Sequence, residues 1–312
     1  MTEKLARRTC LAYLARPSQV VVFGVALCYP STDGFGFPVS GVLEEPFMFR
    51  YSYILIDRIE SIEKGDGLRR TFDLLKQAGY DGVELNLSTP LGVSLDELER
   101  WLAESGLVIP SFLTGESYHD GLCLSSPDGQ VRSATVDRLI EYLEVAKRFQ
   151  SILVVGLLQG LRSDEPSATD ANVRITDCLR RVAAAAEAQA VDIVIEPVNH
   201  LQVGFNNSVA EVLKVIAAID SSAVRPMVDT IHMNIEEVSL SEPVYACRDR
   251  LRHVHLCESN GRGFGTGNVD FDLVLTTLQK IQYGGFVSIK VYRESLESAA
   301  PASLAFLKER GF

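Results

Sequence analysis

Residues 68–87, LRRTFDLLKQAGYDGVELNL, show the alternation of patterns that decides the fold. The first half places Phe72 and Leu75 on one side of a helix, and Gly79 follows as a typical C-terminal cap. The second half, residues 81–87, has the apolar character of a buried strand. We therefore expect a helix that turns directly into a strand.

The same alternation continues to the end of the chain. Further helical patterns are predicted at residues 95–104, 133–149, 171–190, 209–219, 271–281 and 296–308. Further strand patterns are predicted near residues 109, 154, 194, 227, 254 and 288. Strands separated by helices of this length pair in parallel, because only a crossover connection can join them.

A closed barrel needs one more strand upstream, and two segments compete for that place. Residues 49–56 precede the first helix by about a dozen residues, whereas residues 20–27 would need a loop of roughly forty. We prefer 49–56 and predict an α/β protein, a single (β/α)8 TIM barrel over residues 47–312, with an N-terminal extension over 1–46. The alternative is an open doubly wound sheet, which is expected to show an early glycine-rich phosphate turn, and none is present.

Composition excludes several classes of protein. The 312 residues carry a formal charge of −11, so the chain has no electrostatic reason to bind nucleic acid. Its six cysteines are scattered without a CxxC pair, which argues against a zinc knuckle or a disulfide-rich secreted module. No apolar run approaches the roughly 20 residues of a membrane helix. We expect a cytoplasmic protein with reduced thiols and no membrane partner.

Four polar residues stand at or near the ends of predicted strands. Glu196 and Asp229 each end an apolar run, and His255 and Lys290 lie within the last two strands. In a barrel such residues face the mouth, where ligands bind. Carboxylates and imidazole suit a divalent ion such as Mn²⁺, Mg²⁺ or Co²⁺. The alternative is that each is an ordinary hydrogen-bonded residue of a loop.

Three motifs carry a resemblance to a known family: IEPVNH at 195–200, VDTIHMNIEE at 228–237, and HVHLCESN at 253–260 followed by GTG at 265–267. Together they resemble the sugar phosphate isomerase/epimerase family of xylose isomerase-like barrels. Within it the chain looks most like the D-tagatose and D-psicose 3-epimerase branch, over about residues 49–309. The resemblance implies a xylose isomerase-like TIM barrel, a small-molecule sugar substrate and a homo-oligomer.

The resemblance also implies roles for particular residues. Glu196, Asp229 and His255 match ligands of one divalent ion, Mn²⁺, Mg²⁺ or Co²⁺, which would polarise a ketose carbonyl. Glu196 also matches one of two carboxylates that move a proton through a cis-enediolate. His232, three residues after Asp229, matches a residue that hydrogen-bonds substrate oxygens. The candidate catalytic residues are therefore Glu196, His232 and Lys290.

Three positions depart from the family pattern. Lys290 stands where a glutamate ligand is expected, Gln202 where a second glutamate is expected, and Gly261 where an arginine is expected, with Arg262 one place later. A lysine beside a divalent ion is expected to have a lowered pKa. It could act as a neutral base, form a Schiff base with a ketose, bind a carboxylate or phosphate, or mark the loss of the standard chemistry. The candidate substrate-binding residues are His232, Glu84, Glu258, Arg262 and Gln202.

The sequence thus predicts a divalent-metal-dependent isomerase or epimerase that acts on a ketose or related keto-sugar through a cis-enediolate. One alternative is a dehydratase or lyase on a keto-polyol in the same superfamily. Another is a catalytically altered sugar-binding protein, suggested by Lys290 and Gln202. A DNA-repair apurinic endonuclease on the same fold is disfavoured, because the chain has five histidines and a charge of −11.

Overall fold

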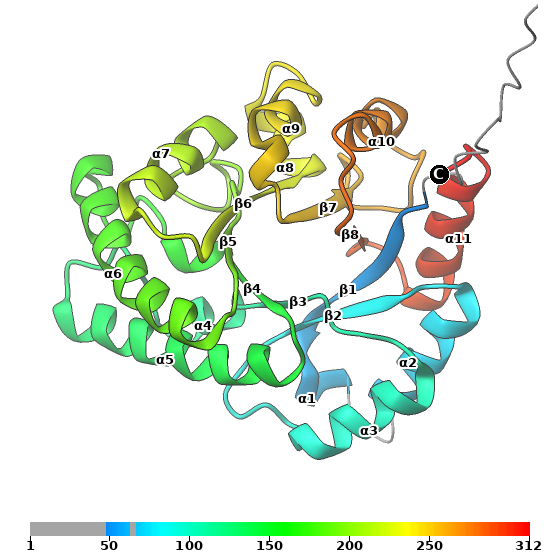
Figure 1. The fold of residues 1–312 in the computed structure, drawn as a ribbon, viewed down its shortest axis with the longest axis horizontal. Coiled ribbons are helices and arrows are strands. Elements are labelled where there is room, and N and C mark those ends of the chain that lie inside the picture. The colour runs from blue at the N-terminus through cyan, green and yellow to red at the C-terminus, as the bar shows by residue number, and fades with distance from the viewer. Residues whose placement is uncertain (1–47, 63–66) are drawn as a thin grey trace, which may run out of the picture. The chain divides into compact units, whose positions relative to one another are not determined.

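The computed structural model describes residues 48–62 and 67–312, and the strands in this part of the chain close into a parallel barrel. Each strand pairs in parallel with the next, and the last pairs with the first. The strands are β1 (Arg50–Arg58), β2 (Gly82–Asn86), β3 (Ser111–Leu113), β4 (Ile152–Val155), β5 (Ile193–Ile195), β6 (Val224–Asp229), β7 (His253–Cys257) and β8 (Phe286–Lys290). They cross the middle of the ribbon in Figure 1, with helices around them. The predicted (β/α)8 barrel is confirmed.

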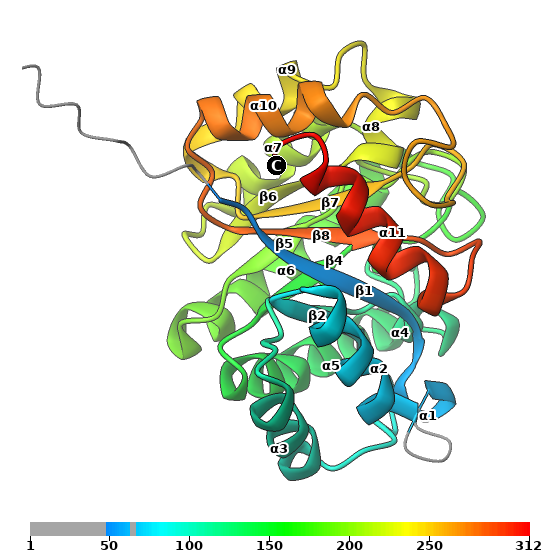
Figure 2. The ribbon, with the colours of Figure 1, turned by 90° about the vertical axis from the view of Figure 1, so that its right-hand side faces the viewer.

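Helices occupy the connections between the strands, and α11 packs against α2 on the side shown in Figure 2. The α-helices are α1 (Ile59–Ile62), α2 (Gly67–Ala78), α3 (Leu95–Ser105), α4 (Glu116–His119), α5 (Gly129–Arg148), α6 (Ala168–Gln189), α7 (Val209–Ile219), α8 (Thr230–Glu236), α9 (Glu242–Cys247), α10 (Phe271–Lys280) and α11 (Leu296–Lys308). Two short 3₁₀ turns are η1 (Leu157–Gln159) and η2 (Arg248–Arg250). None of the helices in the described ranges is long and apolar enough to cross a membrane.

The ends of the chain and one strand differ from the sequence prediction. The predicted first strand at 49–56 is confirmed as β1, whereas the competing segment 20–27 and the expected extension 1–46 lie outside the described residues. The strand predicted near residue 109 lies further along, at Ser111–Leu113. Only an isolated bridge joins Val108 to Gly82, because the proline that follows Ile109 has no N–H with which to continue the ladder.

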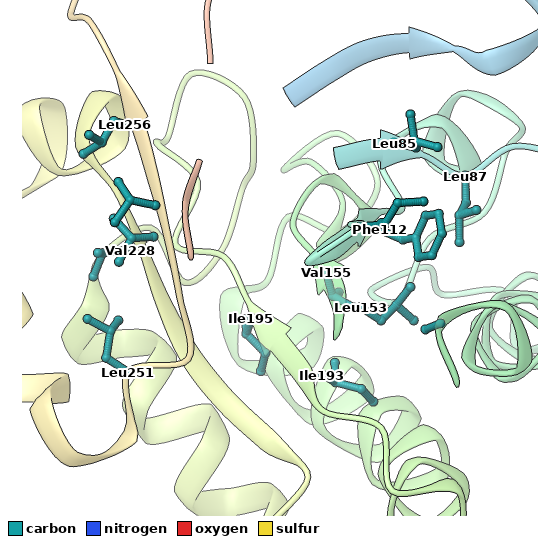
Figure 3. Close-up of a cluster of buried hydrophobic side chains, with 14 of the residues drawn as sticks. Leu85, Leu87, Phe112, Leu153, Val155, Ile193, Ile195, Val228, Leu251 and Leu256 are labelled. Carbon is teal, nitrogen blue, oxygen red and sulfur yellow. The ribbon is translucent and has the colours of Figure 1, made fainter. Parts of the chain in front are cut away.

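Alternation along the strands builds the outer core. Successive side chains of a strand point to opposite faces, so every second residue packs between the barrel and its helices. Leu85, Phe112, Leu153 and Ile193 come from four neighbouring strands and belong to this buried cluster, part of which is shown in Figure 3. The four described cysteines are buried and free, as expected: Cys123, Cys178, Cys247 and Cys257.

The inward-facing side chains divide the barrel interior into two halves. On the β4–β6 side they are apolar and form a separate small cluster of Ile152, Val154, Val194 and Met227. On the opposite side, around Glu84, the inward-facing residues are polar and buried: Ser52, Glu84, Ser111, His253, His255 and Ser288. Two residues further along β1 and β3, Ile54 and Leu113 are apolar and line the cavity described below. The barrel therefore has a dry apolar half and a hydrogen-bonded polar half.

Glu84 is the centre of the polar half. Its carboxylate is fully buried and accepts hydrogen bonds from Ser111 Oγ at 2.6 Å, from Ser288 Oγ and from His253 Nε2 at 2.7 Å. Burial alone would raise the pKa of Glu84, but the two histidines, His253 and His255, hold it well below its usual range. A charge in this position is tolerated because the surrounding donors replace its hydration.

Removing this carboxylate is expected to destabilise the barrel strongly. Glu84→Ala should lower the free energy of unfolding by about 3–5 kcal/mol, because it leaves buried donors without their acceptor. Ser52→Ala is the matched control: it deletes a 3.3 Å hydrogen bond to the same carboxylate and a 2.6 Å hydrogen bond to Ser288 Oγ, and should cost about 1–3 kcal/mol. Urea denaturation followed by circular dichroism measures both losses. Equal losses would contradict a central role for Glu84.

Candidate active site

A cavity of about 310 Å³ opens at the carboxyl ends of the strands. Its charged and imidazole side chains all come from the β5–β8 side: Glu196, His232, His255 and Lys290. The side formed by β1 and β3 is aliphatic and includes Ile54, Ile56 and Leu113. An apolar cavity with a few converging polar groups at the strand ends of a barrel is the usual form of an active site.

Glu196 follows β5 directly and points into this cavity. Gly156, which follows β4, makes room for it, because a Cβ atom at Gly156 would collide with Glu196 Oε2. Burial alone would raise the pKa of Glu196, but His255 and Lys290 outweigh burial and lower it. The carboxylate is therefore ionised and available to accept a proton or to bind a cation.

Asp229 ends β6 and also caps the helix that follows. Its Oδ1 accepts the Ile231 N–H at 3.1 Å, which fixes the start of α8 and leaves Oδ2 to face the cluster. Burial alone would raise the pKa of Asp229, but Lys290 and His232 lower it far below its ordinary value. This double use of Asp229 places His232, in the first turn of α8, beside the same group of side chains.

Two histidines complete the cluster. His255 Nδ1 lies 3.4 Å from Glu196 Oε1 and 3.5 Å from Asp229 Oδ2, and His232 Nε2 lies 3.7 Å from each of these oxygens. Burial lowers the pKa of His232, whereas Glu84 and the two site carboxylates raise that of His255 against the effect of burial. His255 Nδ1 is buried and has no hydrogen-bond partner among the described residues. It is the ring atom of His255 left for a ligand, and it offers a lone pair to a cation once the ring has given up its second proton.

Lys290 lies within this cluster, at the end of β8. Its ammonium contacts Asp229 Oδ2 and lies 4.0 Å from Glu196 Oε1. The sequence led us to expect that a neighbouring divalent ion and burial would lower the pKa of Lys290. Burial does lower it, but the carboxylates of Asp229 and Glu196 outweigh burial and raise it above the ordinary value, so Lys290 is an ammonium here.

Three of the residues predicted to contact substrate lie outside the cavity wall. Glu84 lies inside the barrel, bonded to serines and histidines. Glu258 accepts the backbone N–H groups of Gly265 and Val269 at 3.1 and 3.0 Å, so it organises the loop after β7. The Arg262 side chain is exposed and does not line the cavity. The structure therefore gives Glu84 and Glu258 structural contacts in place of the substrate contacts expected from the sequence.

Of the other predicted residues, His232 and Gln202 do line the cavity, and the structure adds Tyr292 to the wall. The Tyr292 ring covers Gly261, whose φ is +71°, and a Cβ atom at Gly261 would collide with the ring. This explains why a glycine stands where the family pattern suggests an arginine. The sequence did not single out Tyr292, because the segment after β8 that carries it meets the loop of Gly261, after β7, only in the folded protein.

The described residues contain two groups that could hold a metal ion. In the first, Glu196, Asp229 and His232 offer ligand atoms within 4.8 Å of one another at the cavity. The second, formed by Glu84, His253 and His255, is hydrogen-bonded within itself inside the barrel. His255 joins the two, because its Nε2 faces Glu84 and its Nδ1 faces the first group. The candidate metal centre is therefore at the cavity, where Glu196 and Asp229 are shared by His232 and by Nδ1 of His255.

Comparison with known proteins identifies several ketose 3-epimerases to which the chain is similar. The chain is 29% identical over 233 residues to an L-ribulose 3-epimerase of Mesorhizobium japonicum, covering 73% of this chain and 77% of that protein. It is 27% identical to a ketose 3-epimerase of Arthrobacter globiformis, covering 74% and 80%. A crystal structure of D-allulose 3-epimerase from Methylomonas sp. has a TM-score of 0.74 at 22% identity, covering 85% of this chain and 99% of that one.

The match to a family model decides the wider relationship. The model is described as a xylose isomerase-like TIM barrel, and it matches residues 72–310, most of the chain. The resemblance stated from the three sequence motifs is thereby confirmed, and so is its ketose epimerase branch, since the relatives named above are ketose 3-epimerases. The chain belongs to the xylose isomerase-like TIM barrel family.

Proposed function

We propose that this protein is a ketose 3-epimerase or a closely related isomerase, which moves a proton at the carbon next to a sugar carbonyl. One observation carries the proposal: an ionised carboxylate, Glu196, faces the cavity beside the polar hydrogens of His232 and Lys290. The relatives named as L-ribulose and ketose 3-epimerases support the same chemistry.

Each residue has a distinct task in this reaction. Glu196 accepts the carbon-bound proton, since its lowered pKa keeps it ionised at neutral pH. His232 and Lys290 donate hydrogen bonds to the substrate oxygens on which negative charge develops as the cis-enediolate forms. We assign the return of a proton to that intermediate to Lys290, the one ammonium among the described side chains that line the cavity.

The side chains also fit a divalent ion. Glu196 Oε1, Asp229 Oδ2 and His255 Nδ1 lie close enough together to share one cation, and Nδ1 has no other partner among the residues described. The oxygen and imidazole donors suit Mn²⁺, Mg²⁺ or Co²⁺. Bound there, such an ion would supply a Lewis acid beside the substrate carbonyl. One contact opposes the binding of such an ion, because the Lys290 ammonium already donates a hydrogen bond to Asp229 Oδ2.

That contact gives specific support to a second candidate function, a sugar-binding protein with altered catalysis. The ammonium and a divalent ion both require the free oxygen of Asp229, because Oδ1 is occupied by the Ile231 N–H. A dehydratase or lyase, the remaining alternative, would use the same base and is distinguished by its product. A homo-oligomer and a cytoplasmic location remain predictions from the sequence.

Glu196→Gln is expected to lower kcat by about 10²- to 10⁴-fold, because the amide keeps the shape of the side chain but cannot accept a proton. The assay is epimerisation of a ketose panel in deuterated water, with deuterium uptake next to the carbonyl read by NMR. Glu236→Gln is the matched control, since Glu236 pairs with His200 and does not line the cavity. Unchanged turnover and unchanged deuterium uptake in Glu196→Gln would end the proposal, and loss of water from the sugar would favour the lyase.

Metal removal tests the role of the ion. Treatment with a chelator is expected to abolish turnover, and Mn²⁺, Mg²⁺ or Co²⁺ should restore it. Lys290→Gln should bind Mn²⁺ about tenfold or more tightly than the unchanged protein, because the Lys290 ammonium no longer competes with the ion for the carboxylate of Asp229. Isothermal titration calorimetry measures this affinity.

Lys290→Glu separates the two candidate functions. If the unchanged protein is inactive and Lys290→Glu gains epimerase activity, the chain is a binding protein with altered catalysis. Activity in the unchanged protein that Lys290→Glu reduces would instead assign Lys290 a part in the reaction. Turnover that persists through chelation, with no Mn²⁺ binding by calorimetry, would contradict the metal-dependent mechanism.

A further inference from the structure

The two histidines of the site are held through opposite ring nitrogens. Asn199 Nδ2 lies 2.7 Å from Nδ1 of His232, whereas a carboxylate oxygen of Glu84 lies 3.2 Å from Nε2 of His255. An amide nitrogen can only donate a hydrogen bond, and an ionised carboxylate can only accept one. The partners of the two rings therefore require opposite arrangements of the ring proton.

The orientation of the Asn199 amide is set by a second contact. Asn199 is 1% exposed, and its Oδ1 accepts the backbone N–H of Leu201 at 3.1 Å. A flipped amide would place its NH₂ group against that N–H and would lose this hydrogen bond. The group that faces His232 is therefore the NH₂ group, and Nδ1 of His232 must accept from it.

The consequence for His232 lies on the other side of its ring. A neutral imidazole whose Nδ1 accepts a hydrogen bond carries its proton on Nε2. This Nε2 is 3.7 Å from Glu196 Oε1 and 3.7 Å from Asp229 Oδ2, at the cavity. His232 thus presents an N–H donor there and has no lone pair to offer a metal ion.

His255 has the reverse arrangement. In the neutral ring that a metal ligand requires, Nε2 donates to Glu84, so Nδ1, which has no hydrogen-bond partner in the described part of the chain, carries the lone pair for a ligand. Although His232 and His255 stand at similar distances from the same two carboxylates, their partners give them different chemistry. Distance alone would have placed His232 among the metal ligands.

We propose that Asn199 is a positioning residue that holds His232 in the tautomer with its proton on Nε2, so that His232 donates a hydrogen bond to a substrate oxygen and does not bind the metal. This inference rests on the proposed function for its substrate. The tautomer itself is a property of the protein without substrate. Groups that orient a histidine of a metal site in this way commonly change activity by about 10- to 100-fold when they are removed.

The tautomer is measured directly by long-range ¹H–¹⁵N NMR of the full chain, without added metal and with ¹⁵N-labelled histidine. The signals of His232 are identified as those absent from His232→Gln. The unchanged protein should show Nδ1 of His232 without a proton. Asn199→Asp should show Nδ1 protonated, because the new carboxylate can still accept the Leu201 N–H and can only accept from the ring.

Gln202→Glu is the matched control. It adds the same charge to the same loop and, within the described residues, no hydrogen bond links Gln202 to His232, so Nδ1 should remain without a proton. A protonated Nδ1 in the unchanged protein would overturn the proposal. So would an unprotonated Nδ1 in folded Asn199→Asp. If Asn199→Asp does not fold, Asn199→Ala is measured in its place. In that variant Nδ1 of His232 should no longer be uniformly without a proton. A uniformly unprotonated Nδ1 in Asn199→Ala would equally overturn the proposal.

Kinetics separate this inference from the proposed function. Asn199→Asp should lower kcat/KM for the ketose by roughly 10- to 100-fold, since His232 no longer presents a fixed donor. The predicted tautomer in a protein that turns over no keto-sugar would refute the proposed function and leave the positioning by Asn199 intact. The opposite tautomer in an active enzyme would refute only the positioning.

Discussion

A buried carboxylate is the constraint on which the centre of this barrel depends. Glu84 lies fully inside the strands, and a charge in that place is stable only if surrounding donors replace water. Serines of β1, β3 and β8 and the two histidines of β7 supply those donors. The small serine side chains also leave room for the carboxylate in this half of the interior.

The same carboxylate connects the interior of the barrel to its mouth. Glu84 holds one nitrogen of His255, so the other faces Glu196 and Asp229. Asp229 in turn starts the helix that carries His232, and Asn199 holds the far side of that ring. The orientation of each side chain in the site is thus set by a neighbour further from the cavity, which limits the ways in which the cluster can rearrange.

The balance of charge in the cluster depends on one residue. Glu196 and Asp229 bring two negative charges into a place shielded from water, and Lys290 brings the compensating positive charge. Mutual attraction lowers the pKa of both acids and raises that of the lysine, although burial alone would do the reverse. Our expectation of a lowered lysine pKa considered burial and a neighbouring metal ion and left out these two carboxylates.

The barrel, the order of its strands and the residues at the strand ends could all be predicted from the sequence. These follow from local periodicity: one apolar run and one amphipathic helix predict each unit, and alternation within a strand decides which residues face inward. Local pattern failed where a proline displaced β3 and where short helices such as α8 depend on a single cap.

The roles of the strand-end residues could not be predicted in this way, because they depend on contacts made in the folded protein. Glu84 and Glu258 are indistinguishable from substrate-binding glutamates in sequence, yet their oxygens are occupied by serines, histidines and backbone N–H groups. Lys290 meets Asp229, a residue 61 positions away, only when β8 closes the barrel beside β7. Hydrogen bonding and charge depend on distances between segments far apart in the chain, and no local pattern of residues contains those distances.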